Sequence, residues 1–200
     1  LTVLGGYALS KQRLPGRKFF MLMIVFTMWF QVGLMPNYLN IKNLGLLDKR
    51  LGVILIGTMS TFYLIIMRTF FESIPDSMEE SAKIDGANDF VILFKIYLPL
   101  SLPAIATLTL YYFVGRWNTY FWPMIIIKDQ YKVPLQVLLK KLIVEMNVNL
   151  EELASSDASA MTPQTVICAT IVISTVPMLI LYPFVQKYFV KGIMVGAVKG

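Results

Sequence analysis

The sequence contains no histidine and one cysteine, Cys168. The lack of histidine excludes zinc motifs of the HExxH kind, Ser-His-Asp triads and acid–base catalysis by imidazole. A single cysteine excludes a disulfide framework within the chain. The sequence also has no phosphate-binding glycine loop and no carboxylate pair inside an apolar run. We therefore predict that the chain is not an enzyme and that it uses no metal or cofactor.

Charged residues are scarce as well, at 15% of the chain against about 25% in an average soluble domain. Hydrophobic residues make up 56%, and the mean hydropathy is +0.65. This composition predicts an integral membrane protein of the all-α class, a polytopic transmembrane helix bundle. The net charge of +6 would suggest an anionic partner in a soluble protein. Here the cations cluster at the ends of apolar runs, so we expect contact with lipid head groups and no nucleic acid.

Long uncharged runs mark the expected membrane spans. The chain begins with Leu1 rather than Met, and its first ten residues are apolar but too few to cross a bilayer. We interpret them as the end of a helix in a chain truncated at its N-terminus. We predict one transmembrane domain over residues 1–200, with a partial span at about 1–10 and complete spans at about 19–36, 51–71, 98–115 and 162–185.

The orientation rests on a dense basic loop. Four cations and no acid surround the turn at Pro15 and Gly16, and the positive-inside rule places this loop in the cytoplasm: Lys11, Arg13, Arg17 and Lys18. Residues 73–97 then return to the cytoplasmic side. The aromatic stretch after Arg116 is too short for another crossing and is expected to be interfacial or re-entrant, and an amphipathic helix is expected outside over about 135–145.

Five of the twelve carboxylates lie in one segment between two apolar runs, at positions 76, 79, 80, 85 and 89. The pattern predicts a short amphipathic helix that starts at a cap formed by Ser73 and ends near Gly86, where a left-handed residue turns the chain. Glu79 and Lys83 are spaced for an i, i+4 ion pair. Asn88 or Asp89 is placed to cap the next helix.

The same segment resembles the EAA loop of the membrane subunits of binding-protein-dependent ATP-binding cassette importers. That pattern is Glu and two small residues, three further residues, Gly, about nine residues and Ile-x-Leu-Pro. Here it reads Glu80-Ser-Ala-Lys-Ile-Asp-Gly86, then Ile96-Tyr-Leu-Pro99, with Ser81 in place of the first Ala. The Ser-Ile-Pro before the motif, the Arg116-Trp-Asn118 segment and the glycine-rich ending further resemble the carbohydrate-uptake branch.

The resemblance implies a multi-pass permease subunit in the bacterial cytoplasmic membrane. It would form half of the pathway for a sugar or oligosaccharide, with a second permease subunit, two cytoplasmic ATPase subunits and an extracytoplasmic solute-binding protein. The loop at about 73–97 would be the coupling helix, and ATP would be hydrolysed in the partner. The coupling residues implied are Glu79, Glu80, Ser81, Ala82, Lys83, Asp85, Gly86 and Ala87.

Other interpretations stay open at this point. The loop's charges also suit a solvated amphipathic helix without a partner. A secondary transporter would need an ionisable residue inside a span, and the complete spans have none except at their ends; an importer for a solute other than a sugar is a further alternative. The candidate substrate-pathway residues are Asn118, Trp117, Tyr120 and Gln31, although aromatic residues near a membrane boundary commonly form the interfacial belt.

Overall fold

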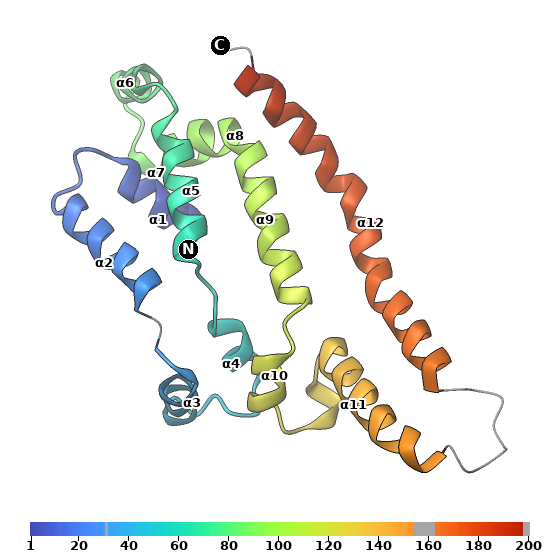
Figure 1. The fold of residues 1–200 in the computed structure, drawn as a ribbon. Helices are drawn as coiled ribbons and strands as arrows, with labels where there is room; N and C mark the ends of the chain where they lie inside the picture. Colours follow the sequence, from blue (N-terminus) through green and yellow to red (C-terminus); the bar gives the residue numbers. More distant parts are fainter. Residues whose placement is uncertain (31, 154–162, 198–200) are drawn as a thin grey trace. The chain divides into compact units, whose positions relative to one another are not determined.

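The computed structural model describes residues 1–30, 32–153 and 163–197, and within these the regular structure is helical, with no strand (Figure 1). The all-α prediction is therefore confirmed. The chain divides into two compact units, one formed by residues 1–36, 57–111 and 185–200 and the other by 37–56 and 112–184.

The first unit contains the N-terminal helices and the acidic segment. Its elements are α1 (Thr2–Ser10), α2 (Arg17–Trp29), α5 (Thr61–Glu72), α6 (Asp76–Ile84), α7 (Asp89–Ile92), the π-helical turn η1 (Leu93–Tyr97), α8 (Leu98–Leu100) and most of α9 (Leu102–Trp117). Two glycines allow α1 to approach α5 closely. A Cβ atom at Gly6 would lie 3.2 Å from both the backbone nitrogen of Arg68 and the Cβ of Met67.

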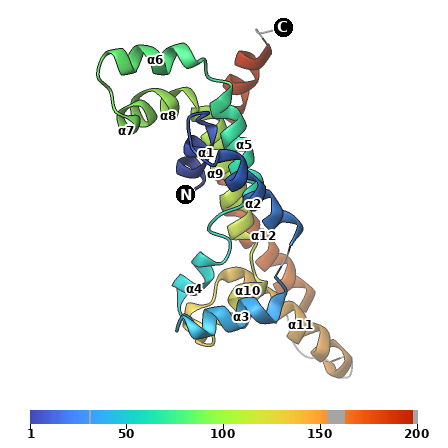
Figure 2. The ribbon, with the colours of Figure 1, turned by 90° about the vertical axis from the view of Figure 1, so that its left-hand side faces the viewer.

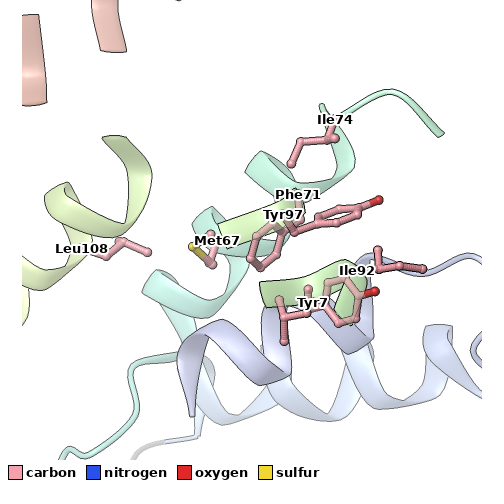
Figure 3. Close-up of a cluster of buried hydrophobic side chains, with 8 residues drawn as sticks. Tyr7, Met67, Phe71, Ile74, Ile92, Tyr97 and Leu108 are labelled. Carbon is pink, nitrogen blue, oxygen red and sulfur yellow. The ribbon is translucent and has the colours of Figure 1, made fainter. Parts of the chain in front are cut away.

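An aromatic cluster joins α1, α5 and η1 (Figure 3). The rings of Tyr7, Phe71 and Tyr97 meet edge to face, with centroids 5.1 to 6.0 Å apart. Met67 and Ile92 are fully buried beside them. Edge-to-face packing adds to the burial of apolar area, so this cluster fixes the base of the acidic segment on α1 and α5.

The acidic segment forms a helix, a sharp turn and a second helical stretch. Figure 2 shows α6 extending from the end of α5 and the chain returning through α7 and α8. Gly86 makes the turn with φ of +78°, a conformation that side chains with a Cβ disfavour. The Asn88 side chain then caps α7 by accepting a hydrogen bond from the backbone N–H of Val91 at 2.9 Å. The predicted left-handed glycine and the cap at Asn88 are confirmed.

The predicted cap at Ser73 is wrong. Ser73 ends α5 instead, and its hydroxyl donates to the carbonyl of Phe70 at 2.7 Å. Pro75 precedes α6 without a side-chain cap. The serine lies immediately after a helix and before another, and its hydroxyl pairs with the C-terminal carbonyl of the first.

The second unit contains most of α3 (Leu34–Asn43), α4 (Arg50–Leu55), α10 (Phe121–Ile126), the 3₁₀ turn η2 (Gln130–Lys132), α11 (Leu135–Leu153) and the first part of α12 (Pro163–Ala197). Ile126 and Val137 are fully buried where α10 packs against α11. The amphipathic helix expected at 135–145 is present and continues to Leu153, and the aromatic stretch expected to be interfacial contains α10.

Several expected spans are divided into shorter helices. In the run at 19–36, α2 ends at Trp29 and α3 starts at Leu34. The run at 51–71 is interrupted at Gly57, which has a φ of +80°. The run at 98–115 breaks at Ser101. Pro36 and Pro103 lie in the first turns of α3 and α9, where proline's missing N–H costs no hydrogen bond. The first span was predicted to end at about residue 36, yet Pro36 lies in the first turn of the next helix.

Within the described residues no single helix has both the length and the apolar character needed to cross a membrane. Two bent pairs of helices meet those requirements only when each pair is counted together. They are α2 with α3, and Asp89–Leu100 with α9, the latter bent by 81°. The span boundaries therefore stay predictions.

Candidate coupling site

Glu79 lies on the inner face of α6 and is the centre of an ion-pair cluster. Its side chain is 9% exposed. One carboxylate oxygen accepts from the ammonium of Lys11 and from the hydroxyl of Tyr97, the latter at 3.1 Å. The other oxygen accepts from Lys83, the predicted i, i+4 partner, and lies 3.7 Å from the guanidinium of Arg13. This cluster fastens α6 to the basic loop after α1 and to η1.

The electrostatics of the cluster favour an ionised carboxylate. Burial raises the pKa of Glu79, but hydrogen bonds from Lys11 and Lys83 and the charge of Lys11 outweigh it and hold the pKa at about 2. The ammonium of Lys11 also lies over the ring of Tyr97, 3.7 Å from its centroid, in cation–π geometry. Arg13 forms a further ion pair with Asp89, at the start of α7. The basic loop therefore holds both arms of the acidic segment.

The outer face of α6 is solvent-exposed. Glu80, Ser81, Lys83, Asp85 and Gly86 are all exposed, and the Ser81 hydroxyl donates to the carbonyl of Ser77 at 2.9 Å within the helix. Two large apolar side chains accompany them, with exposed fractions of 45% at Met78 and 86% at Ile84. This face can offer both charges and apolar area to another protein.

The inner face of the segment packs against the aromatic cluster. Ala82 and Ala87 are half-buried there, and the backbone N–H of Ala87 donates to the carbonyl of Ala82 at 2.9 Å. Ile74 is buried in the same cluster. Met78 instead faces outward, so the apolar side chains of this segment are divided between its two faces.

Three of the four candidate substrate-pathway residues lie around the link from α9 to α10. The indole N–H of Trp117 donates to the carbonyl of Ser174 in α12 at 3.1 Å. The amide of Asn118 is exposed and donates to the carbonyl of Val114 at 3.0 Å. Tyr120 is also exposed, immediately before α10. Gln31 lies outside the described residues, and the pathway role of all four stays a prediction.

Two features that shape these sites were not predicted from the sequence. The first is the pairing of Lys11 and Arg13 with the acidic segment, although a cationic loop and an acidic loop on one side of a membrane protein suggest such a pair. The second is the role of Asp48. In the second unit, one carboxylate oxygen of Asp48 accepts from the backbone N–H groups of Lys128 and Asp129 at 3.0 Å each, and the other pairs with Lys132 at 3.1 Å.

Asp48 has a positive φ of 56°, and its own N–H donates to Ile126 at 2.9 Å. The hydrogen bond from the backbone of Asp129, followed by that from Lys132, lowers the pKa of Asp48. This residue joins the loop before α4 to the segment after α10. No sequence signal connects positions 80 residues apart.

Apolar helices leave many large hydrophobic side chains exposed, and a charged segment of two helices and a tight turn connects two of them. These features are typical of a membrane protein. The family model of the binding-protein-dependent transport system inner membrane component matches residues 19–195. The chain belongs to this family. It is a transport subunit and a membrane protein, built as a helical bundle, that works with other transporter subunits.

Similar proteins agree with this assignment. The chain is 46% identical over 201 residues to the polygalacturonan/rhamnogalacturonan transport system permease protein YtcP of Bacillus subtilis (strain 168), covering 100% of the chain and 70% of YtcP. It is 40% identical to protein LplC of the same organism, over 97% of the chain and 66% of LplC.

A solved structure is also similar. A chain of a bacterial ABC transporter involved in the import of the acidic polysaccharide alginate matches with a TM-score of 0.85 and 50% identity, covering 94% of this chain and 67% of that one. The chain thus spans about two thirds of the length of these relatives.

Proposed function

We propose that this chain forms half of the transmembrane pathway of an ATP-driven importer for a carbohydrate. The observation that carries the proposal is the EAA loop, which lies within the family match and presents an exposed helix anchored on the apolar helices. The partners are a second permease subunit, two cytoplasmic ATPase subunits and an extracytoplasmic solute-binding protein. The assembly lies in the bacterial cytoplasmic membrane.

An acidic oligosaccharide is the solute class that the relatives favour. YtcP, at 46% identity, is named for polygalacturonan and rhamnogalacturonan, and the solved structure, at 50%, belongs to an importer of an acidic polysaccharide. Relatives named for arabinooligosaccharides and for sn-glycerol-3-phosphate are 28% and 29% identical. Uptake by the complete system distinguishes these classes when galacturonate, arabinose and glycerol-phosphate compounds are compared.

The residues of the loop divide into two roles in this proposal. Glu80, Ser81, Lys83, Asp85 and Gly86 form the surface that contacts the ATPase, with Met78 and Ile84 adding apolar area. Glu79 acts from the inner face, where its pairing with Lys11 supports α6 rather than meeting the partner. Ala82 and Ala87 keep the helix close to the aromatic cluster. ATP hydrolysis takes place in the partner ATPase subunits, and α6 transmits the closure of the ATPase dimer to the membrane helices of this chain.

Two variants test the coupling role in a reconstituted complete transporter. Glu80→Lys reverses an exposed charge on the proposed contact face. Gly86→Pro forbids a φ of +78° and removes the N–H that donates to Lys83 at 3.0 Å. Each is expected to lower solute-stimulated ATPase activity at least tenfold while the subunit still inserts into the membrane.

Lys49→Glu is the control, because it reverses an exposed charge in the second unit. It is expected to retain stimulation. Normal transport by both loop variants would show that the loop is not the coupling element.

A further inference from the structure

A pocket of about 880 Å³ lies in the first unit between the basic loop, α2 and α5, and neither the family assignment nor the coupling role accounts for it. Three cations line it: Arg17, Lys18 and Arg68. Its other wall is apolar and includes Met21, Leu22 and Val25 along α2. None of the described residues that line it is acidic. A cationic end and an apolar wall call for an amphipathic anion.

The cations are incompletely neutralised within the described chain. Arg17 and Arg68 both pair with the same oxygen of Glu72, so two positive charges share one carboxylate. The Nε of Arg68 is buried and has no acceptor among the described residues. Lys18 is exposed and forms no ion pair with any of them. A net positive charge of about two therefore remains at the pocket.

The start of α2 adds to this potential. Gly16 precedes the helix without a side-chain cap, and the first turn contains no acid. The positive end of the helix dipole is thus left uncompensated beside Arg17 and Lys18. Beyond the cations, α2 presents a strongly apolar surface, with Leu22 72% exposed and Phe26 62% exposed. The N-terminal end of α2 is therefore positively charged, and the rest of its exposed surface is largely apolar.

We infer that this pocket binds one anionic phospholipid, with its phosphate between Lys18, Arg17 and Arg68 and an acyl chain along Met21, Leu22 and Val25. Basic pockets between membrane helices on the cytoplasmic side bind anionic head groups in this way. A free phosphate would satisfy the cations but would make no contact with the apolar wall. The inference rests on the membrane setting of the proposed function and is independent of the solute transported.

The test uses the full-length subunit in its complete transporter, reconstituted in vesicles of equimolar phosphatidylglycerol and phosphatidylcholine. The photoreactive residue p-benzoylphenylalanine replaces Met21, and the lipid adducts at that position are identified by mass spectrometry. Phosphatidylglycerol adducts are expected to exceed phosphatidylcholine adducts several-fold. Lys18→Gln in this background should reduce the ratio about fivefold, since a cation near a membrane surface contributes roughly that factor.

Lys95→Gln is the matched control, because it removes one exposed cation that does not line the pocket, and the ratio should persist. The same probe at Val25 checks the result if replacement of Met21 impairs assembly. Equal adducts of both lipids, equal effects of Lys18→Gln and Lys95→Gln, peptide adducts in place of lipid, or loss of the preference on addition of inorganic phosphate would each overturn the inference. Adduct formation is read without transport, so a wrong solute assignment leaves this test intact.

Discussion

At the scale of single residues, Glu79 shows that a residue in an acidic motif can be buried rather than exposed on the surface. Its spacing to Lys83 predicts an ion pair, which the structure confirms, but that pair is the outer edge of a buried cluster. Lys11 is 68 residues away in sequence and Tyr97 is 18. Local spacing predicts contacts within one helix. It carries no information on which distant residue approaches the other side of the carboxylate.

The cluster predicts a pH dependence of stability. Because the folded-state pKa of Glu79, about 2, lies below the ordinary value of 4.5, the unfolded chain binds this proton more tightly. The stabilisation is therefore complete above about pH 4.5 and is lost as the pH falls toward 2. Glu79→Gln should lower stability at pH 7 by about 3 kcal/mol, because Lys11 would be left buried without its charge partner.

Thermal unfolding of the purified full-length subunit in detergent measures this effect. The difference between wild type and Glu79→Gln should narrow as the pH is lowered from 5 to 3. Glu80→Gln is the control, since Glu80 is exposed on the same helix and its replacement should change stability little at any pH. A wild-type advantage that stays constant down to pH 3 would contradict the assigned ion pair.

At the scale of elements, the sequence predicts helices well and their ends less well. Apolar runs identify the regions of α2, α5, α9 and α12 because hydropathy follows composition. The breaks depend on backbone angles instead, as at Gly57 with its positive φ. The turn of the acidic segment was predictable because Gly86 follows a charged amphipathic pattern and precedes Asn88. Gly57 lies inside a long apolar run, which predicts one continuous span, so the break at this glycine was not predicted.

The close contact between α1 and α5 predicts that a larger side chain at Gly6 lowers the stability of the subunit. Gly6→Leu should destabilise the subunit by about 2 kcal/mol, because its Cβ would lie 3.2 Å from the backbone of Arg68 and from Met67, and larger side chains overpack such a contact. The melting temperature should fall by roughly 5 °C in detergent.

Gly115→Leu is the matched control for this substitution. Gly115 is also helical, in α9, and a Cβ there would meet nothing within 4 Å. Leucine favours a helix over glycine by roughly 0.8 kcal/mol, so this variant should be neutral or slightly more stable. Equal losses at the two positions would mean that the close approach of α1 to α5 is not what glycine serves at position 6.

At the scale of the whole molecule, the class and the family could be inferred from the sequence because the EAA loop combines a long motif with flanking apolar runs. The division into two units could not, since it places neighbouring stretches such as α4 and α5 in different units. It does sort the polar segments. The basic loop and the acidic segment belong to the first unit, whereas Asp48, Lys128, Asp129 and Lys132 belong to the second.

The span order expected from the sequence, together with the positive-inside rule, predicts opposite sides of the membrane for the two sets of polar segments. Cysteine labelling tests this prediction. The background is a cysteine-free full-length subunit in which Cys168 is replaced by Ser. One new cysteine is then introduced at Asp85 or at Tyr131, both of which are exposed. A membrane-impermeant maleimide should label Tyr131→Cys in intact spheroplasts and Asp85→Cys only in inverted vesicles. Detergent-opened membranes, where both must react, provide the control. Labelling of both positions from the same side would invalidate the predicted span order, and with it the cytoplasmic placement of α6 on which coupling to an ATPase depends.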